Sequence, residues 1–222
     1  MVAKDAGGFA MSRTQSTMVK LGTPAPPFEL VDVASGRAIG RDDVAAMAWD
    51  DEARDQTNRR SGGGPSKTGR RGLLVMFICV HCPYVKHVEE ELARIGVDFE
   101  GEVAIVAISS NDIEAYPQDG PEFMKAQAER LGFRFPYLLD ETQEVARAYD
   151  AACTPDFFLF DADMNLVYRG QLDDSRPRRK DFGNDILVTG KDLRKAMDEL
   201  IRGIRPDTNQ TMSIGCNIKW KE

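Results

Sequence analysis

Two uninterrupted apolar runs constrain the fold of this chain more than any other feature of its sequence. They occupy residues 73–78 and 103–108, and each is long enough to form a β-strand that is buried on both faces. The segment between them carries apolar residues at helical spacing, namely Val85, Val88, Leu92 and Ile95. A strand, a helix and a second strand in this order predict a right-handed parallel βαβ unit.

The rest of the chain adds helices and hairpins to this unit. Helical patterns cover residues 121–131, 142–149 and 192–201. Two pairs of short strands predict antiparallel hairpins, one around a turn at Ser35 and Gly36 and the other joining residues 157–160 to 166–168. The predicted class is therefore α/β, with an N-terminal β-hairpin ahead of the βαβ unit.

Length and composition predict one domain with decorations. The 222 residues suit a single domain, and 42% of them are hydrophobic, enough for a buried core. We expect a flexible N-terminal tail at residues 1–17 and a domain over 18–222. Residues 50–72 are rich in charge and glycine, so they predict a disordered insertion within that domain.

Charge and hydropathy exclude two kinds of partner. The net charge of −7 argues against nucleic-acid binding, which favours a basic surface. No segment approaches the roughly 20 apolar residues of a membrane span, and residues 1–20 lack the apolar core of a secretory signal. We therefore expect a cytoplasmic protein with neither nucleic-acid nor membrane partners.

The cysteine pair Cys79 and Cys82 forms a Cys-Val-His-Cys motif directly after the first apolar run. A helix starting there would stabilise a thiolate, so Cys79 is the expected nucleophile, with a lowered pKa. Cys82, one turn later, could resolve the mixed disulfide formed at Cys79. Between them, His81 could favour the reduced form or be an exposed residue without a role. Zinc sites use the same cysteine spacing.

Three further features are candidates for the same site. A cis peptide bond between Thr154 and Pro155 would present the Thr154 backbone to a substrate sulfur, although Pro155 could simply begin an edge strand. Cys153 and Cys216 are candidate auxiliary redox residues; Cys216 could relay electrons or be a small buried apolar residue. Arg176 could hold an anionic group at the substrate rim or belong to a solvated loop.

The motifs resemble the thioredoxin-like superfamily, in its alkyl hydroperoxide reductase/thiol-specific antioxidant branch, and within it the peroxiredoxin-like thioredoxin-family proteins. The similar segments are residues 21–28, 76–86, 107–112, 151–160, 168–176 and 213–220. The resemblance implies a thioredoxin fold, in which helices flank a central mixed sheet. It also implies that Cys79 attacks, that Cys82 resolves, that Pro155 is the cis-proline facing them, and that Cys153 lies near the pair.

Two departures from the resemblance bear on the chemistry. Peroxiredoxins carry a Pro-x-x-x-Thr/Ser-x-x-Cys signature, but Gly72 and Met76 occupy those positions ahead of Cys79. Thioredoxins have an acidic residue on the strand before the cysteines, and the run at 73–78 has none. Proton transfer would then fall to His81, a water molecule or a distant carboxylate.

Three functions follow as hypotheses. The first is a thiol–disulfide oxidoreductase without a cofactor, acting on protein or small-molecule disulfides and thiols and served by a reductant such as thioredoxin or glutathione. The second is a thiol-dependent peroxidase acting on peroxide. The third is a soft-metal site for zinc or copper, in which Cys79 and Cys82 are joined by Cys153, His81 or His87.

Overall fold

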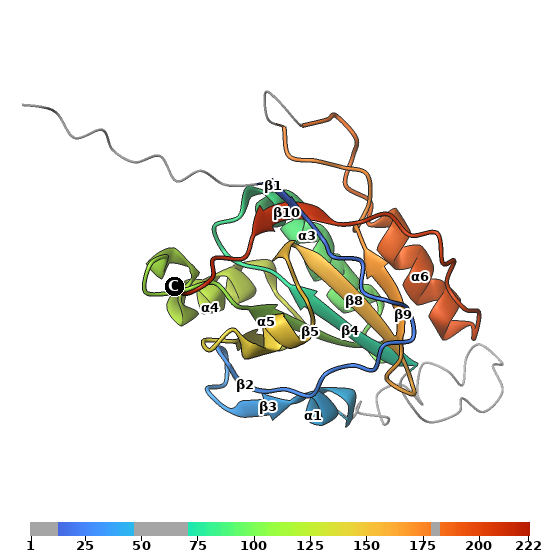
Figure 1. Ribbon diagram of the computed structural model, residues 1–222, viewed down its shortest axis with the longest axis horizontal. Helices are drawn as coiled ribbons and strands as arrows, with labels where there is room; N and C mark the ends of the chain where they lie inside the picture. Colours follow the sequence, from blue (N-terminus) through green and yellow to red (C-terminus); the bar gives the residue numbers. More distant parts are fainter. Residues whose placement is uncertain (1–12, 47–70, 179–182) are drawn as a thin grey trace, which may run out of the picture.

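The computed structural model describes residues 13–46, 71–178 and 183–222. Its main sheet consists of β2 (Glu29–Asp32), β3 (Ala38–Gly40), β4 (Gly72–Phe77), β5 (Ala104–Ser109), β6 (Tyr137–Leu139), β8 (Asp156–Asp161) and β9 (Leu166–Gly170). These strands form a seven-stranded mixed sheet in the order β3-β2-β6-β5-β4-β8-β9 (Figure 1). The helices are α1 (Arg41–Ala46), α3 (Pro83–Asp98), η1 (Pro117–Asp119), α4 (Pro121–Leu131), α5 (Glu144–Ala148) and α6 (Lys191–Ile201).

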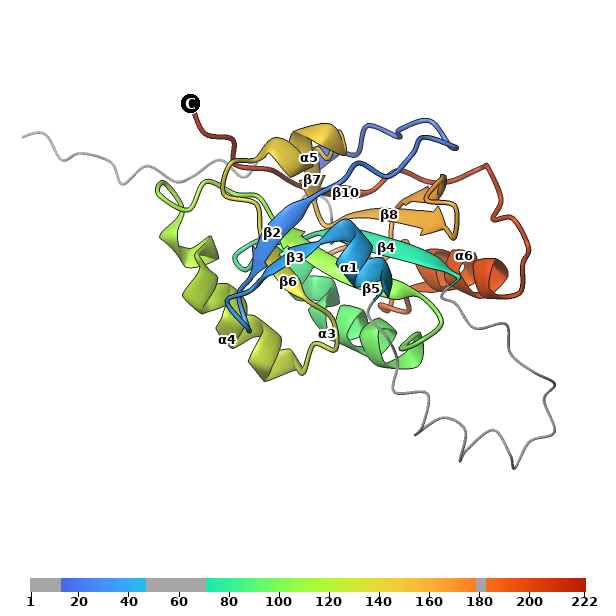
Figure 2. The same ribbon diagram turned by 90° about the horizontal axis from the view of Figure 1, so that it is seen from below.

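The βαβ unit is the centre of the fold. Strands β4 and β5 are parallel neighbours, α3 connects them along the chain, and every residue of both strands is buried. Successive β4 side chains point to opposite faces of the sheet, so Met76 joins the core beneath α3, whereas Phe77 joins the core beneath α1 and α5. Figure 2 shows α3 and α5 on opposite sides of the sheet. This two-sided burial explains the continuous apolar runs.

A second, smaller sheet joins the two ends of the described chain. It contains β1 (Arg13–Gln15), β7 (Cys153–Thr154) and β10 (Ile214–Asn217), in the order β1-β10-β7 with antiparallel pairing throughout. Strand β10 also contacts α3 (Figure 1). The C-terminal strand therefore crosses the region where α3 begins, which is the region of the cysteine motif.

The thioredoxin fold with an added N-terminal hairpin is confirmed. The hairpins β2–β3 and β8–β9 are antiparallel, and the helix predicted at 121–131 has those bounds. The sequence patterns missed the short elements α1, β1, β6, β7 and β10. No helix among the described residues has the length and apolar character to span a bilayer.

The predicted boundaries fall partly outside the described residues. Residues 1–12 of the expected tail and most of the expected insertion at 50–72 lie outside the described part of the chain, as do residues 179–182. Within the expected tail, residues 13–15 form β1 and pair with β10, so the folded part begins earlier than residue 18. At the other boundary, β4 already includes Gly72.

Candidate active site

The cysteine motif lies between the end of β4 and the start of α3. Helix α3 begins at Pro83, whose fixed φ suits the first helical position. Cys82 is consequently the N-cap, with an extended backbone (φ −64°, ψ 122°), and Cys79 precedes the helix. Both cysteines are buried, with 1% of Cys79 and 0% of Cys82 exposed.

The cis-proline loop, residues 153–156 at the junction of β7 and β8, faces both sulfurs. The Thr154–Pro155 peptide bond is cis, as the resemblance implies. Cys79 Sγ lies 3.3 Å from Thr154 Oγ1, and the Cys82 thiol donates to the Thr154 carbonyl oxygen across 3.1 Å. One residue of the cis-proline loop therefore contacts both cysteines.

The expected lowered pKa of Cys79 is wrong for this arrangement. Burial raises the pKa of the Cys79 thiol, the hydrogen bond and charge of Cys82 raise it further, and the Asp119 carboxylate adds to the effect. The physical reason is that α3 starts after Cys82, so Cys79 lies outside its first turn. A proline at the first helical position was the sequence signal for this placement.

Cys82 carries the more stable thiolate of the pair. Burial raises its pKa, but hydrogen bonds from Cys216, Cys79 and Thr154 outweigh burial and leave the pKa lowered. Of the two thiols, Cys82 is therefore the one whose pKa is lowered.

A buried carboxylate that the sequence reasoning did not identify organises the motif. Asp119, at the end of η1, is fully buried. Its Oδ1 accepts the backbone N–H groups of Val80 (2.9 Å) and His81 (3.0 Å). Its Oδ2 pairs with His81 Nδ1 and accepts a hydrogen bond from Asn111 Nδ2 at 2.8 Å. Asp119 thus holds the loop between the cysteines and orients its imidazole.

Cys79, His81 and Asp119 form a compact group. One donor atom from each lies within 4.8 Å of the other two. The His81 ring also stacks on Tyr116, with centroids 5.8 Å apart and planes 5° from parallel. A thiolate, an imidazole and a carboxylate suit zinc, and they equally suit proton transfer at a thiol.

The other predicted metal ligands lie elsewhere. Among the described residues, neither Cys153 nor His87 belongs to a close group of three metal-ligating side chains. The Cys153 thiol is buried and donates to the Pro155 carbonyl oxygen at 3.7 Å. Burial, followed by the Asp156 charge, raises its pKa.

The C-terminal strand brings Cys216 to the cysteine pair. In the register of β10 and β7, Cys216 lies opposite Thr154. Its side chain hydrogen-bonds to the Cys82 sulfur and is 3% exposed. Of the two candidate auxiliary cysteines, Cys216 is therefore the one in side-chain hydrogen-bond contact with Cys82.

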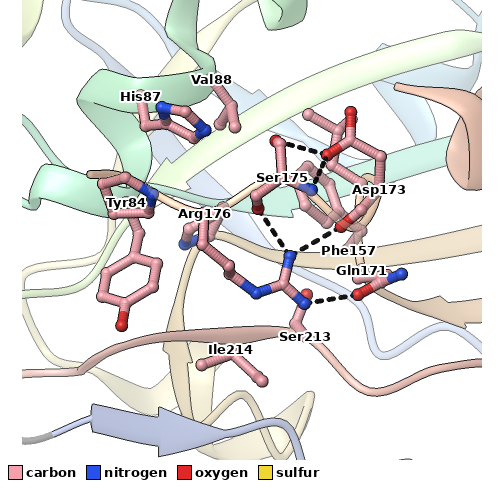
Figure 3. Close-up of a pocket in the computed structure, with 13 residues that line it drawn as sticks. Tyr84, His87, Val88, Phe157, Gln171, Asp173, Ser175, Arg176, Ser213 and Ile214 are labelled. Carbon is pink, nitrogen blue, oxygen red and sulfur yellow. Dashed lines mark hydrogen bonds between the residues drawn. The ribbon is translucent and has the colours of Figure 1, made fainter. Parts of the chain in front are cut away.

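Arg176 lies beside the cis-proline, in a small pocket lined also by Tyr84, His87 and Pro155 (Figure 3). The cavity volume is about 20 Å³, which is room for one water molecule. The Arg176 guanidinium donates to the carbonyl oxygens of Asp173 and Ser175 and to the side chain of Gln171 (Figure 3). Arg176 therefore lines this small pocket, and its guanidinium is held by acceptors of the protein itself.

Comparisons with known proteins show which family the chain belongs to. The sequence profile of the AhpC/TSA family matches residues 56–169. The chain belongs to the AhpC/TSA family. An uncharacterized conserved protein from Geobacillus kaustophilus, whose crystal structure is known, has 48% sequence identity to this chain. The two structures match with a TM-score of 0.81, over 96% of this chain and 98% of that one.

Two further structures extend the likeness. A hypothetical protein from Sinorhizobium meliloti is 41% identical, with a TM-score of 0.79 and coverage of 94% of this chain and 98% of that one. The thioredoxin domain of a thiol-disulfide oxidoreductase from Bacteroides vulgatus is 15% identical, with a TM-score of 0.51 and coverage of 81% and 99%; that likeness concerns the fold alone. No curated protein matches the AhpC/TSA chain described here.

Proposed function

We propose that this AhpC/TSA-family protein is a thiol–disulfide oxidoreductase whose redox pair is Cys79 and Cys82. The observation that carries the proposal is the contact of both sulfurs with Thr154 of the cis-proline loop. Membership of the family supports thiol chemistry at this site.

Cys79 is the proposed attacking sulfur. Cys82 is enclosed by the first turn of α3 and by Cys216, whereas Cys79 is followed by the half-buried residues Val80 and His81. The Cys79 thiol hydrogen-bonds to the Cys82 sulfur. The two sulfurs are therefore placed for Cys82 to attack Cys79 once a mixed disulfide has formed.

The reaction then proceeds as two exchanges. Cys79 Sγ bonds to one substrate sulfur, breaks the substrate disulfide and releases the other sulfur as a thiolate. Cys82 next attacks Cys79 Sγ, forms the Cys79–Cys82 disulfide and releases the second substrate sulfur. The His81–Asp119 pair, beside Cys79, is the proposed group that accepts and returns the proton during these steps.

Single cysteine variants test the proposal against a model disulfide such as oxidised glutathione. We expect Cys79→Ser to abolish exchange, and Cys82→Ser to stop at a mixed disulfide on Cys79 that intact-mass spectrometry detects. Cys153→Ser is the matched control, because its buried thiol contacts the Pro155 carbonyl, and it should retain exchange. Undiminished exchange by the Cys79 variant would contradict the proposal.

The metal alternative has its own readout. Protein purified without chelators should contain no stoichiometric zinc or copper if the group of Cys79, His81 and Asp119 serves proton transfer. Stoichiometric metal that protects Cys79 from alkylation until a chelator is added would replace the enzyme proposal with a metal site.

A further inference from the structure

Strand β10 is fixed against the cis-proline loop at the point where it carries a cysteine. The residue before Cys216 is Gly215, and a Cβ there would lie 2.0 Å from the Thr154 carbonyl oxygen and 3.2 Å from the Pro155 nitrogen. The two backbones therefore approach too closely for any side chain at this position. This contact determines where the Cys216 side chain can lie.

The Cys216 side chain lies on the redox pair. It hydrogen-bonds to the Cys82 sulfur, and Cys216 lies opposite Thr154, whose carbonyl oxygen accepts the Cys82 thiol. Cys82 thus has two sulfur neighbours, Cys79 and Cys216, and all three residues are at most 3% exposed. A thiol in contact with one sulfur of a disulfide is placed for exchange with it.

We propose that Cys216 is a third redox cysteine, which exchanges with the Cys79–Cys82 disulfide to form a Cys82–Cys216 disulfide. This inference rests on the proposed function, which supplies the first disulfide. The Cys216 thiolate attacks Cys82 Sγ, the S–S bond to Cys79 breaks, and Cys79 leaves as a thiolate that takes up the proton lost by Cys216. One disulfide and one thiol are present before and after, so no other oxidant or reductant enters.

The exchange changes the state of the nucleophile. After it, the oxidised protein holds its disulfide between α3 and β10, while Cys79 is again a thiol. Cys79 can then react with a second substrate sulfur before any external reductant acts. With only two cysteines, by contrast, the oxidised protein would have no free thiol in contact with Thr154.

The test is disulfide mapping of a variant that lacks the nucleophile. Cys79→Ser leaves Cys82 with Cys216 as its contacting thiol, and diamide supplies the oxidation. Trypsin cleavage at lysine and arginine, except before proline, places Cys82 in peptide 72–86 and Cys216 in peptide 203–219. We expect these two peptides to be linked after oxidation and separate after reduction.

Two double variants provide controls. Cys79→Ser with Cys216→Ser should lose the linked peptides, whereas Cys79→Ser with Cys153→Ser should keep them. If Cys82 of the Cys79→Ser variant can still be fully alkylated after diamide treatment, the inference is overturned. A link from Cys82 to peptide 148–169, which contains Cys153, would overturn it as well.

The same map separates this inference from the proposed function. In the unaltered protein, a Cys79–Cys82 disulfide lies within peptide 72–86 and forms whether or not Cys216 takes part. If this disulfide forms in the unaltered protein but the Cys82 and Cys216 peptides stay separate in the Cys79→Ser variant, the redox role of Cys216 is refuted and the proposed function stands. If the Cys79–Cys82 disulfide does not form and the protein does not exchange with oxidised glutathione, the proposed function itself is refuted.

Discussion

Asp156 should make the stability of this protein fall as pH rises through the neutral range. The residue follows the cis-proline, is fully buried and faces the core beneath α5 as part of β8. Burial raises the pKa of its carboxyl from 3.8 to about 8, against the lowering effect of the Ala152 and Phe157 backbone N–H groups. Those N–H groups are 3.4 Å and 3.2 Å from the carboxylate oxygens.

The sign and size of the effect follow from proton linkage. Between about pH 4 and pH 8 the folded protein keeps the Asp156 proton and the unfolded chain releases it, so the unfolded state binds fewer protons. The contribution of Asp156 to the free energy of unfolding therefore falls by about 1.4 kcal/mol per pH unit. It is largest below pH 4 and levels off above pH 8. From pH 5 to pH 7 the loss is about 3 kcal/mol.

Asp156→Asn removes this titration and keeps the shape of the side chain. We would measure urea unfolding of the reduced protein at pH 5, 6 and 7, for the unaltered chain, for Asp156→Asn and for Asp163→Asn. The exposed Asp163 lies in the turn between β8 and β9 and serves as the matched control. At each pH we would take the difference in free energy of unfolding between the variant and the unaltered protein, and then compare that difference across the three pH values.

Two outcomes are distinguishable. The Asp156→Asn variant should gain about 3 kcal/mol relative to the unaltered protein between pH 5 and pH 7, and the stability of the control should change with pH in parallel with that of the unaltered protein. A difference that is independent of pH would refute the reasoning, whatever the absolute cost of the amide, because a constant cost reflects packing or hydrogen bonding rather than titration.

Two further perturbations address the site. Asp119→Asn should lower the pKa of Cys79, because the carboxylate charge raises it, and should still slow disulfide exchange about 100-fold if Asp119 serves proton transfer. The rate of Cys79 alkylation as a function of pH measures its pKa, and the rate of disulfide exchange measures the second effect. Glu114→Gln, at an exposed residue, is the control. An unchanged exchange rate in Asp119→Asn would exclude the proton-transfer role. Gly215→Ala should destabilise the protein by about 1–3 kcal/mol and speed alkylation of Cys82, because the new Cβ would lie 2.0 Å from the Thr154 carbonyl oxygen. Thermal unfolding and timed alkylation measure this, and equal values in both proteins would contradict the proposed packing of β10.

The sequence allowed prediction of elements whose signal is local. The βαβ unit follows from two apolar runs and one helical period, and the cysteine motif adjoins the first run, so its position in the fold was predictable. The position of Cys82 as N-cap was also encoded, by Pro83. The expectation that the helix dipole lowers the pKa of Cys79 did not use this signal, which places Cys79 ahead of the first turn of α3.

The remaining features depend on contacts between distant residues. Asp119 lies 39 positions from Val80, whose N–H it accepts, and nothing in the segment around it signals a buried carboxylate. Strand β10 is a short segment that becomes a strand by pairing with β1 and β7. Such short pairings carry little periodicity of their own, so tertiary contacts determine them.

The burial of the redox pair has a kinetic consequence. With 1% of Cys79 and 0% of Cys82 exposed, a large thiol reagent can react only in conformations where β7 and β10 have moved away from the two sulfurs. The labelling rate then equals the intrinsic thiol rate multiplied by the population of the open form, as in hydrogen exchange of a protected amide. Labelling with reagents of increasing size would thus measure the local free energy of opening, and the same opening would select among substrates before any sulfur reacts.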